Sequence, residues 1–247
     1  MEKELRISTI TSILKVSDDI NLLKIYDEIP ISEYIPYIEY GNDNVPRGFS
    51  KKSLKKKRKK KKKKIFYNQS TIHITHDGKV MNVKLFNNGR IQITGLKNEY
   101  QARQLIETLI SYFQDFDIFN EDIKIIDEKI VLINSDFDIK MNINRELLHR
   151  EIIENDIYSS YEPCIYPGVN IKYFINNNNH NNGICNCESL CNGKGDGYGD
   201  GDCKKVTIAV FKSGKIIITG GQNKRQINES YQFITNFINN RKDLLKY

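Results

Sequence analysis

Apolar and polar residues alternate along several short stretches of the chain, which is the pattern of strands that bury one face. Strands are predicted over 5–16, 66–75, 123–141 and 169–175. In the second of these, Ile72 and Ile74 alternate with polar neighbours. The sequence His76–Lys79 directly after it predicts a hairpin turn.

Helices are predicted for the segments 18–25, 102–113, 145–153 and 227–238. In the two long ones, apolar residues return every three or four positions. Asn98 can accept hydrogen bonds from the first amides of one long helix, and Gln101 can reach back, as in a capping box. Asn223 and Gln226 repeat this arrangement before the last helix. Each half of the chain is therefore expected to end in a long helix that follows antiparallel strands.

Two predicted hairpins, over 81–95 and 206–220, are near copies of each other. Six residues of the first copy recur 125 positions later: Phe86, Gly89, Thr94, Gly95, Asn98 and Gln101 reappear as Phe211, Gly214, Thr219, Gly220, Asn223 and Gln226. Six identities at one offset indicate an internal duplication. Two copies favour a pseudo-symmetric domain over a solenoid.

Positive charge is concentrated in one short tract. Twelve of the fourteen residues from Lys51 to Lys64 are Lys or Arg, and without them the formal net charge of +7 becomes −5. Like charges keep such a tract solvated, so it either contacts nothing, touches nucleic acid or serves nuclear import. A second low-complexity insertion, at about 176–204, is rich in Asn, Cys and Gly.

Four of the five cysteines lie within nineteen residues: Cys185, Cys187, Cys191 and Cys203. Four thiolates can close a tetrahedral structural zinc site, and a metal would hold an otherwise costly loop in place. Free thiols in a flexible loop and redox pairing are the alternatives. With no secretory signal, a disulfide framework is the less favoured explanation.

No arrangement of residues predicts catalysis. The four histidines are scattered without a candidate nucleophile beside them, and the glycine-rich run 193–201 lacks the strand–loop–helix setting of a phosphate loop. No apolar run approaches the roughly 18 residues of a membrane helix. We therefore expect an intracellular protein that is not an enzyme, requires no cofactor, and has neither a membrane partner nor a small-molecule substrate.

An ordered set of motifs resembles the core domain of the TATA-box-binding protein family. In the second half the motifs are Ser159–Pro163, Tyr166–Gly168, Phe211–Lys215 and Thr219–Gly220. In the first half the matching residues are Phe86, Gly89, Arg90, Thr94 and Gly95, and Thr9–Ser12 resembles the opening strand. The resemblance covers most of the chain except roughly 36–64 and 176–204.

The resemblance implies an α+β fold with the form of a saddle. Two pseudo-symmetric repeats would share a curved antiparallel sheet of about ten strands, with helices on the convex face and DNA on the concave face. The first repeat would occupy 1–118, with the basic insertion at about 45–64, and the second 119–247, with its insertion at about 176–204. Saddle proteins of this kind bend DNA by about 80° with apolar side chains wedged into the minor groove.

The resemblance also assigns residues that contact DNA. The wedges would be Phe211 with Tyr166 in the second repeat, and Phe86 with Phe66 in the first. Phe49 is the alternative to Phe66, because the segment Pro46–Phe49 resembles the family's sequence at this position. Contacts to phosphates, sugars and minor-groove acceptors would come from Arg90, Thr94, Lys172, Ser213, Lys215 and Thr219.

Several positions depart from the family. Thr9 and Leu132 stand where it has paired asparagines, and Asn134, two residues on and hence on the same sheet face, can substitute. Lys84 and Gln92 stand where apolar floor residues are expected. A floor with fewer apolar contacts predicts weaker selectivity for a TATA sequence.

The segment from Tyr161 to Ile165 resembles the family's loop that meets a IIB-type initiation factor. Glu162 and Ile165 are kept in kind, whereas Cys164 replaces an acidic residue. The three residues expected to contact the partner are therefore Tyr161, Glu162 and Ile165.

The implied function is that of a general transcription initiation factor. It would bind AT-rich promoter DNA through the minor groove, bend it, and recruit a IIB-type factor and RNA polymerase. Two alternatives stay open: a saddle that binds proteins after losing DNA binding, and a nonspecific DNA-binding protein that acts through the lysine tract. Its location would be the nucleus or, for a large DNA virus with an AT-rich genome, the cytoplasmic site of viral transcription.

Overall fold

The computed structural model describes residues 3–41, 45–50, 66–177 and 182–246. The basic tract Lys51–Lys64 lies outside the described residues. The chain divides into two compact units, which we call the amino-terminal unit, Ile10–Ile130, and the carboxy-terminal unit, Met1–Thr9 with Val131–Tyr247. The boundary between the two sequence repeats, expected at 118/119, stays a prediction.

Eleven strands follow the order β3-β2-β4-β5-β6-β1-β7-β11-β10-β9-β8. Two long strands, β1 (Lys3–Val16) and β7 (Ile125–Asp138), contribute residues to both units. The α+β class with one large antiparallel sheet is confirmed, with one strand more than the ten expected. Among the described helices, none combines the length and the hydropathy needed to cross a membrane.

The amino-terminal unit pairs five strands with the end of β1. They are β2 (Tyr37–Tyr40), β3 (Arg47–Gly48), β4 (Gln69–His76), β5 (Lys79–Phe86) and β6 (Arg90–Leu96). Helix α3 (Gln101–Gln114) packs on β6, and α1 (Leu22–Glu28) packs beside β2 and β4. One face of these strands is buried under the helices, and the opposite face is half-buried and largely polar.

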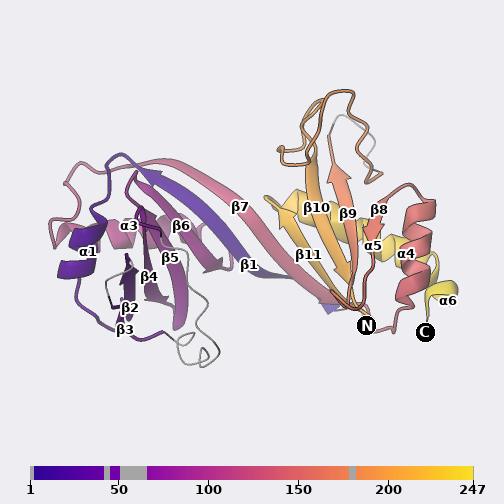
Figure 1. Ribbon diagram of the computed structural model, residues 1–247, viewed down its shortest axis with the longest axis horizontal. Helices are drawn as coiled ribbons and strands as arrows, with labels where there is room; N and C mark the ends of the chain where they lie inside the picture. The colour runs from indigo at the N-terminus through magenta and orange to yellow at the C-terminus, as the bar shows by residue number, and fades with distance from the viewer. Residues whose placement is uncertain (1–2, 42–44, 51–65, 178–181, 247) are drawn as a thin grey trace. The chain divides into compact units, whose positions relative to one another are not determined.

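The carboxy-terminal unit repeats this plan (Figure 1). Its strands are β8 (Tyr158–Ser160), β9 (Val169–Ile175), β10 (Lys204–Val210) and β11 (Lys215–Gly221), which pair with β7. Helix α5 (Lys224–Asn239) packs on β10 and β11, α4 (Arg145–Glu154) packs on β8 and β9, and α6 (Lys242–Leu245) contacts both helices. The insertion between β9 and β10 extends beyond the ends of these strands.

The predicted helix caps are confirmed. The Asn98 side chain accepts from the amides of Tyr100 and Gln101, while the Gln101 side chain accepts from the Lys97 amide at 2.7 Å. Before α5, the Asn223 side chain accepts from the Gln226 amide at 3.0 Å. Both long helices therefore begin where the sequence indicates.

The first helix begins later than predicted, at Leu22 instead of residue 18. The Ile20 amide donates to the carbonyl of Asn87, at the Phe86 hairpin, at 2.8 Å, which holds the preceding segment out of a helix. Asn21 then caps the helix by accepting from the Lys24 amide at 3.0 Å. This tertiary contact explains why the sequence pattern gave a start that was too early.

Candidate nucleic-acid interface

Two aromatic rings meet at the hairpin end of the carboxy-terminal sheet. The centroids of Tyr166 and Phe211 lie 5.8 Å apart with their planes at 58°. A Cβ at Gly168 would lie 2.9 Å from Tyr166 Cε1 and 3.2 Å from Phe211 Cε1, so only glycine leaves room for both rings. Phe211 is half-buried and Tyr166 is 37% exposed, which leaves ring surface available to a ligand. The predicted wedge pair is therefore assembled.

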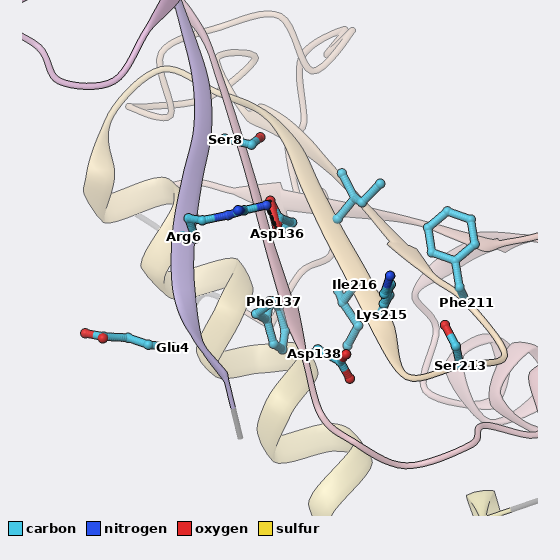
Figure 2. A pocket seen from close by; sticks show the side chains of 11 residues that line it. Glu4, Arg6, Ser8, Asp136, Phe137, Asp138, Phe211, Ser213, Lys215 and Ile216 are labelled. Atoms are coloured by element: carbon cyan, nitrogen blue, oxygen red, sulfur yellow. Dashed lines mark hydrogen bonds and ion pairs between the residues drawn. The ribbon is translucent and has the colours of Figure 1, made fainter. Parts of the chain in front are cut away.

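A hollow of about 800 Å³ opens beside this pair, and residues of β1, β7 and β11 line it (Figure 2). Ser213 and Lys215 stand at its hairpin edge, as expected for groups that meet a DNA backbone. On the opposite side the Arg6 guanidinium donates to both carboxylate oxygens of Asp136, at 2.8 and 2.9 Å, which raises the pKa of Arg6. Sequence reasoning missed this ion pair because its partners are 130 residues apart.

A row of hydrogen-bonding side chains crosses the open face of the carboxy-terminal sheet. Strand register places Lys172 opposite Thr207, Thr207 opposite Thr219, and Thr219 opposite Asn134. Lys172 Nζ donates to Thr207 Oγ1 at 3.0 Å, and the Thr219 hydroxyl donates to the Asn134 amide oxygen. The row brings together three predicted residues and adds Thr207, which was not predicted.

Lys172 is the titratable group of this row with a perturbed pKa. Partial burial lowers the pKa of its ammonium group first, and the nearby charge of Lys205 lowers it further. Both effects disfavour the cation, so a phosphate placed beside these two lysines would relieve their repulsion. The electrostatics of this edge therefore suit an anionic partner.

The next row toward the hairpin contains two apolar residues. Asn170 is opposite Ala209, Ala209 opposite Ile217, and Ile217 opposite Asp136. Ile217 is 38% exposed, which is unusual for isoleucine in a strand and leaves an apolar floor open to a ligand. The open face of this unit thus combines an apolar residue, Ile217, with the polar row and the Tyr166–Phe211 aromatic pair.

The amino-terminal unit has the matching rows with different chemistry. One row joins His73, Asn82, Thr94 and Thr11, and the hydroxyl oxygens of Thr11 and Thr94 lie 3.3 Å apart. The other row joins Thr71, Lys84, Gln92 and Ile13. Lys84 and Gln92 therefore occupy the places that Ala209 and Ile217 hold in the other unit. The polar floor expected from the sequence is present.

The aromatic pair of the amino-terminal unit is less complete. Phe86 ends β5 opposite Gln69, and within the described residues we find no ring contact to a second aromatic side chain. Phe66 and Phe49 are both exposed, so the structure does not choose between them. Strand register instead gives Tyr67, 69% exposed, as the counterpart of Tyr166.

The assignment of Tyr67 follows from counting along the paired strands. Ser70 lies opposite Leu85, and Val169 lies opposite Val210, the residue 125 positions after Leu85. Ser70 therefore corresponds to Val169, and three residues earlier Tyr67 corresponds to Tyr166. The sequence comparison missed this position because this strand recurs after 99 residues and not after 125.

The remaining predicted contacts differ in accessibility. Arg90 is exposed at the start of β6, where a cation can reach a phosphate. The Thr9 hydroxyl oxygen is buried and has no hydrogen-bond partner among the described residues. Asn134, proposed to substitute for the missing asparagine, is the better placed of the two because it joins the polar row.

The predicted partner loop is an exposed turn held by α4. The amides of Ile165 and Tyr166 both donate to the Glu162 carbonyl, and Ile165 is 80% exposed. The Arg145 guanidinium lies over the Tyr161 ring at 5.2 Å and donates to the Pro167 carbonyl. A rigid loop that displays an isoleucine is suited to a protein contact.

The four predicted metal ligands converge in the insertion between β9 and β10. The Sγ atoms of Cys185, Cys187, Cys191 and Cys203 all lie within 4.8 Å of one another. Cys164, the fifth cysteine, is exposed in the partner loop.

Fold and site together define a class: an α+β protein of two repeats whose antiparallel sheet leaves one face open to a ligand. A family model described as transcription factor TFIID, or TATA-binding protein, matches residues 127–240. The solved TATA-binding protein of Methanococcus jannaschii has the same fold, with a TM-score of 0.59 and 17% identity over 96% of this chain and 99% of that chain.

Two curated relatives carry related names. A TATA-box-binding protein-like protein of Acanthamoeba polyphaga mimivirus is 28% identical over 94% of this chain and 64% of its own length. The TATA-box-binding protein of Dictyostelium discoideum is 26% identical over 61% of this chain and 57% of its own length. The chain thus spans less than two thirds of either relative. Together these findings support a divergent core domain of the TATA-binding protein family.

Proposed function

We propose that this protein is a transcription initiation factor that binds promoter DNA through the minor groove and bends it. The observation that carries the proposal is the Tyr166–Phe211 pair, which stands at the hairpin end of an open sheet face beside Ser213 and Lys215. The binding uses no cofactor and no catalytic step.

The aromatic pair supplies the bend. A ring inserted between two base pairs unstacks one step, at a cost of a few kcal/mol, and opens the groove to more protein surface. Ile217, which is 38% exposed, then covers the widened floor with apolar surface, and the buried Ala209 lies opposite it in the strand register. Since the rings are already in contact, binding needs little reorganisation of these side chains.

The polar row supplies hydrogen bonds to base edges. Adenine N3 and thymine O2 are the acceptors that A·T pairs offer in the minor groove. Thr207 and the Asn134 amide group can donate to such acceptors, since Asn134 uses its oxygen to accept from Thr219. Ser213, Lys215 and Arg90 stand at hairpins, where phosphate contacts fix the register of the complex.

A bending assay tests the proposal. Fluorescence energy transfer between the ends of an AT-rich duplex would be compared for the wild type, Phe211→Ala, Phe86→Ala and Tyr100→Ala. Tyr100 is the matched control, because it is an exposed aromatic residue at the start of α3. We expect loss of the bend with Phe211→Ala, a smaller loss with Phe86→Ala, and no change with Tyr100→Ala.

A variant without Lys51–Lys64 separates this mechanism from binding through the lysine tract. If the deletion alone abolishes binding and Phe211→Ala bends DNA normally, the protein is a nonspecific DNA binder. Failure of every variant, the wild type included, to bind DNA would favour the protein-interaction module. The polar floor at Lys84 and Gln92 is the observation in favour of that second function.

The loop from Tyr161 to Ile165 is the proposed contact for a IIB-type factor, which would in turn bring RNA polymerase. Two observations support this role: Ile165 is exposed, and the Arg145 guanidinium packs over the Tyr161 ring. Ile165→Asp should abolish capture of the IIB-type factor on DNA and leave DNA bending intact. Such a factor acts where promoters are, in the nucleus or at a viral transcription site.

A further inference from the structure

We propose that Cys185, Cys187, Cys191 and Cys203 bind one zinc ion, and that this metal is what orders residues 182–203, the described part of the insertion that leads into β10. The Sγ of Cys203 lies 3.3 Å from that of Cys187 and 3.7 Å from that of Cys185. Zinc–sulfur bonds of about 2.3 Å in a tetrahedron place the sulfurs about 3.8 Å apart. These two distances lie close to that spacing, and all four sulfurs lie within 4.8 Å of one another, so the cluster is compact enough for a tetrathiolate site.

A buried amide side chain lies against the cluster. The buried Asn176 side chain donates to the Cys203 sulfur at 3.5 Å. Donors of this kind orient thiolate ligands and spread their negative charge, as the partners of metal ligands do.

The insertion has no apolar core of its own. Between residues 182 and 202 the only buried positions are Gly183, Gly193 and Gly197, while Leu190 is 99% exposed. Fixing the backbone of this segment has a conformational-entropy cost that its apolar burial does not offset. A metal bound by four thiolates contributes enough free energy to order a segment of this size.

The same insertion is attached to the sheet and to α5 by polar contacts. The Lys205 amide donates to the Gly193 carbonyl at 2.8 Å, and the Gln226 side chain donates to the Asp196 carbonyl at 3.1 Å. Gly193 has φ +69°, and a Cβ there would lie 2.7 Å from the Lys205 side chain. The backbone after Cys191 therefore passes close to β10.

The test is metal content of the full chain, purified in reductant and loaded with Zn²⁺. We expect one zinc per chain by native mass spectrometry, and with Co²⁺ the intense sulfur-to-metal absorption of a tetrahedral tetrathiolate. Cys187→Ser should lose the stoichiometric metal, and Cys164→Ser, which removes the one cysteine outside the cluster, should keep it. Circular dichroism would confirm that Cys187→Ser, at a half-exposed position, retains the fold of the sheet.

Limited proteolysis adds the second readout. Chelation of the wild type should raise the rate of cleavage within residues 182–203 about tenfold, to the rate seen for Cys187→Ser. The proposal is overturned by a Zn²⁺-loaded wild type that holds no metal, by equal metal content in Cys187→Ser, or by a cluster found as disulfides under reductant. It is also overturned if chelation leaves the cleavage rate unchanged. None of these results bears on DNA bending by Phe211.

Discussion

Replacing Gly214 with alanine should destabilise the protein by far more than replacing Gly78. Gly214 has φ +80° in the turn of the Phe211 hairpin, and a Cβ there would lie 2.4 Å from the Met141 carbonyl oxygen and 3.2 Å from Ile139 Cγ1. The Ile139 amide donates to the Gly214 carbonyl at 3.0 Å, so the two segments cannot separate without losing that bond. The substitution therefore adds a steric clash to backbone strain.

The two contributions can be estimated separately. A non-glycine residue in the left-handed region costs about 1–2 kcal/mol. Relieving the clash with the carbonyl requires a backbone shift of the kind that costs about 1–3 kcal/mol. Gly78 has φ +68° and would place its Cβ in open space, so Gly78→Ala should show the first contribution alone.

Urea unfolding followed by circular dichroism would measure both variants. We expect Gly214→Ala to lose about 2–5 kcal/mol and Gly78→Ala about 1–2 kcal/mol. Gly89→Ala should resemble Gly214→Ala, because its Cβ would lie 2.5 Å from the Asp18 carbonyl oxygen. Equal losses for Gly214→Ala and Gly78→Ala would refute the reasoning, since the clash between the new Cβ and the Met141 carbonyl would then have no effect on the free energy of unfolding.

Three further outcomes follow from the same contacts. DNA affinity should fall as the pH rises through the lowered pKa of Lys172, because the ammonium then loses its charge; a titration of binding against pH should show no such fall for Lys172→Arg. Lys215→Gln should reduce the slope of log affinity against log salt by about 1, and a pair of titrations at low and high salt would measure it. Gln226→Ala should cost about 1–3 kcal/mol in urea unfolding, because it removes the two hydrogen bonds that the Gln226 side chain makes with the Gln222 amide and the Asp196 carbonyl; an unchanged midpoint would contradict this.

The parts of the fold that rest on local chemistry could be predicted from the sequence. The hairpin turns depend on glycines that adopt positive φ, and the long helices depend on caps within a few residues. Strand β2, Tyr37–Tyr40, could not be predicted, because the segment is a strand only through its pairing with β4. Pairing between distant segments is the information that a local pattern lacks.

The same distinction applies to the candidate interface. Phe211, Lys215 and Thr219 were identifiable, because each stands at a fixed distance from a recognisable turn. Tyr67 was not, because its equivalence to Tyr166 depends on which residues of β4 and β5 face each other. The Arg6–Asp136 ion pair was hidden for the same reason, since only the alignment of β1 with β7 brings the two residues together.

The two halves of the sheet have matching strands and differ in the side chains on their open faces. Lys84 and Gln92 replace the apolar pair Ala209 and Ile217 at matching positions of the register. An apolar floor leaves the guanine amino group in the minor groove without an acceptor, whereas a glutamine side chain can offer one. Under the proposed function the second repeat is therefore the one that demands A·T pairs. The first repeat then contributes contact area more than sequence selectivity, which agrees with its less complete aromatic pair.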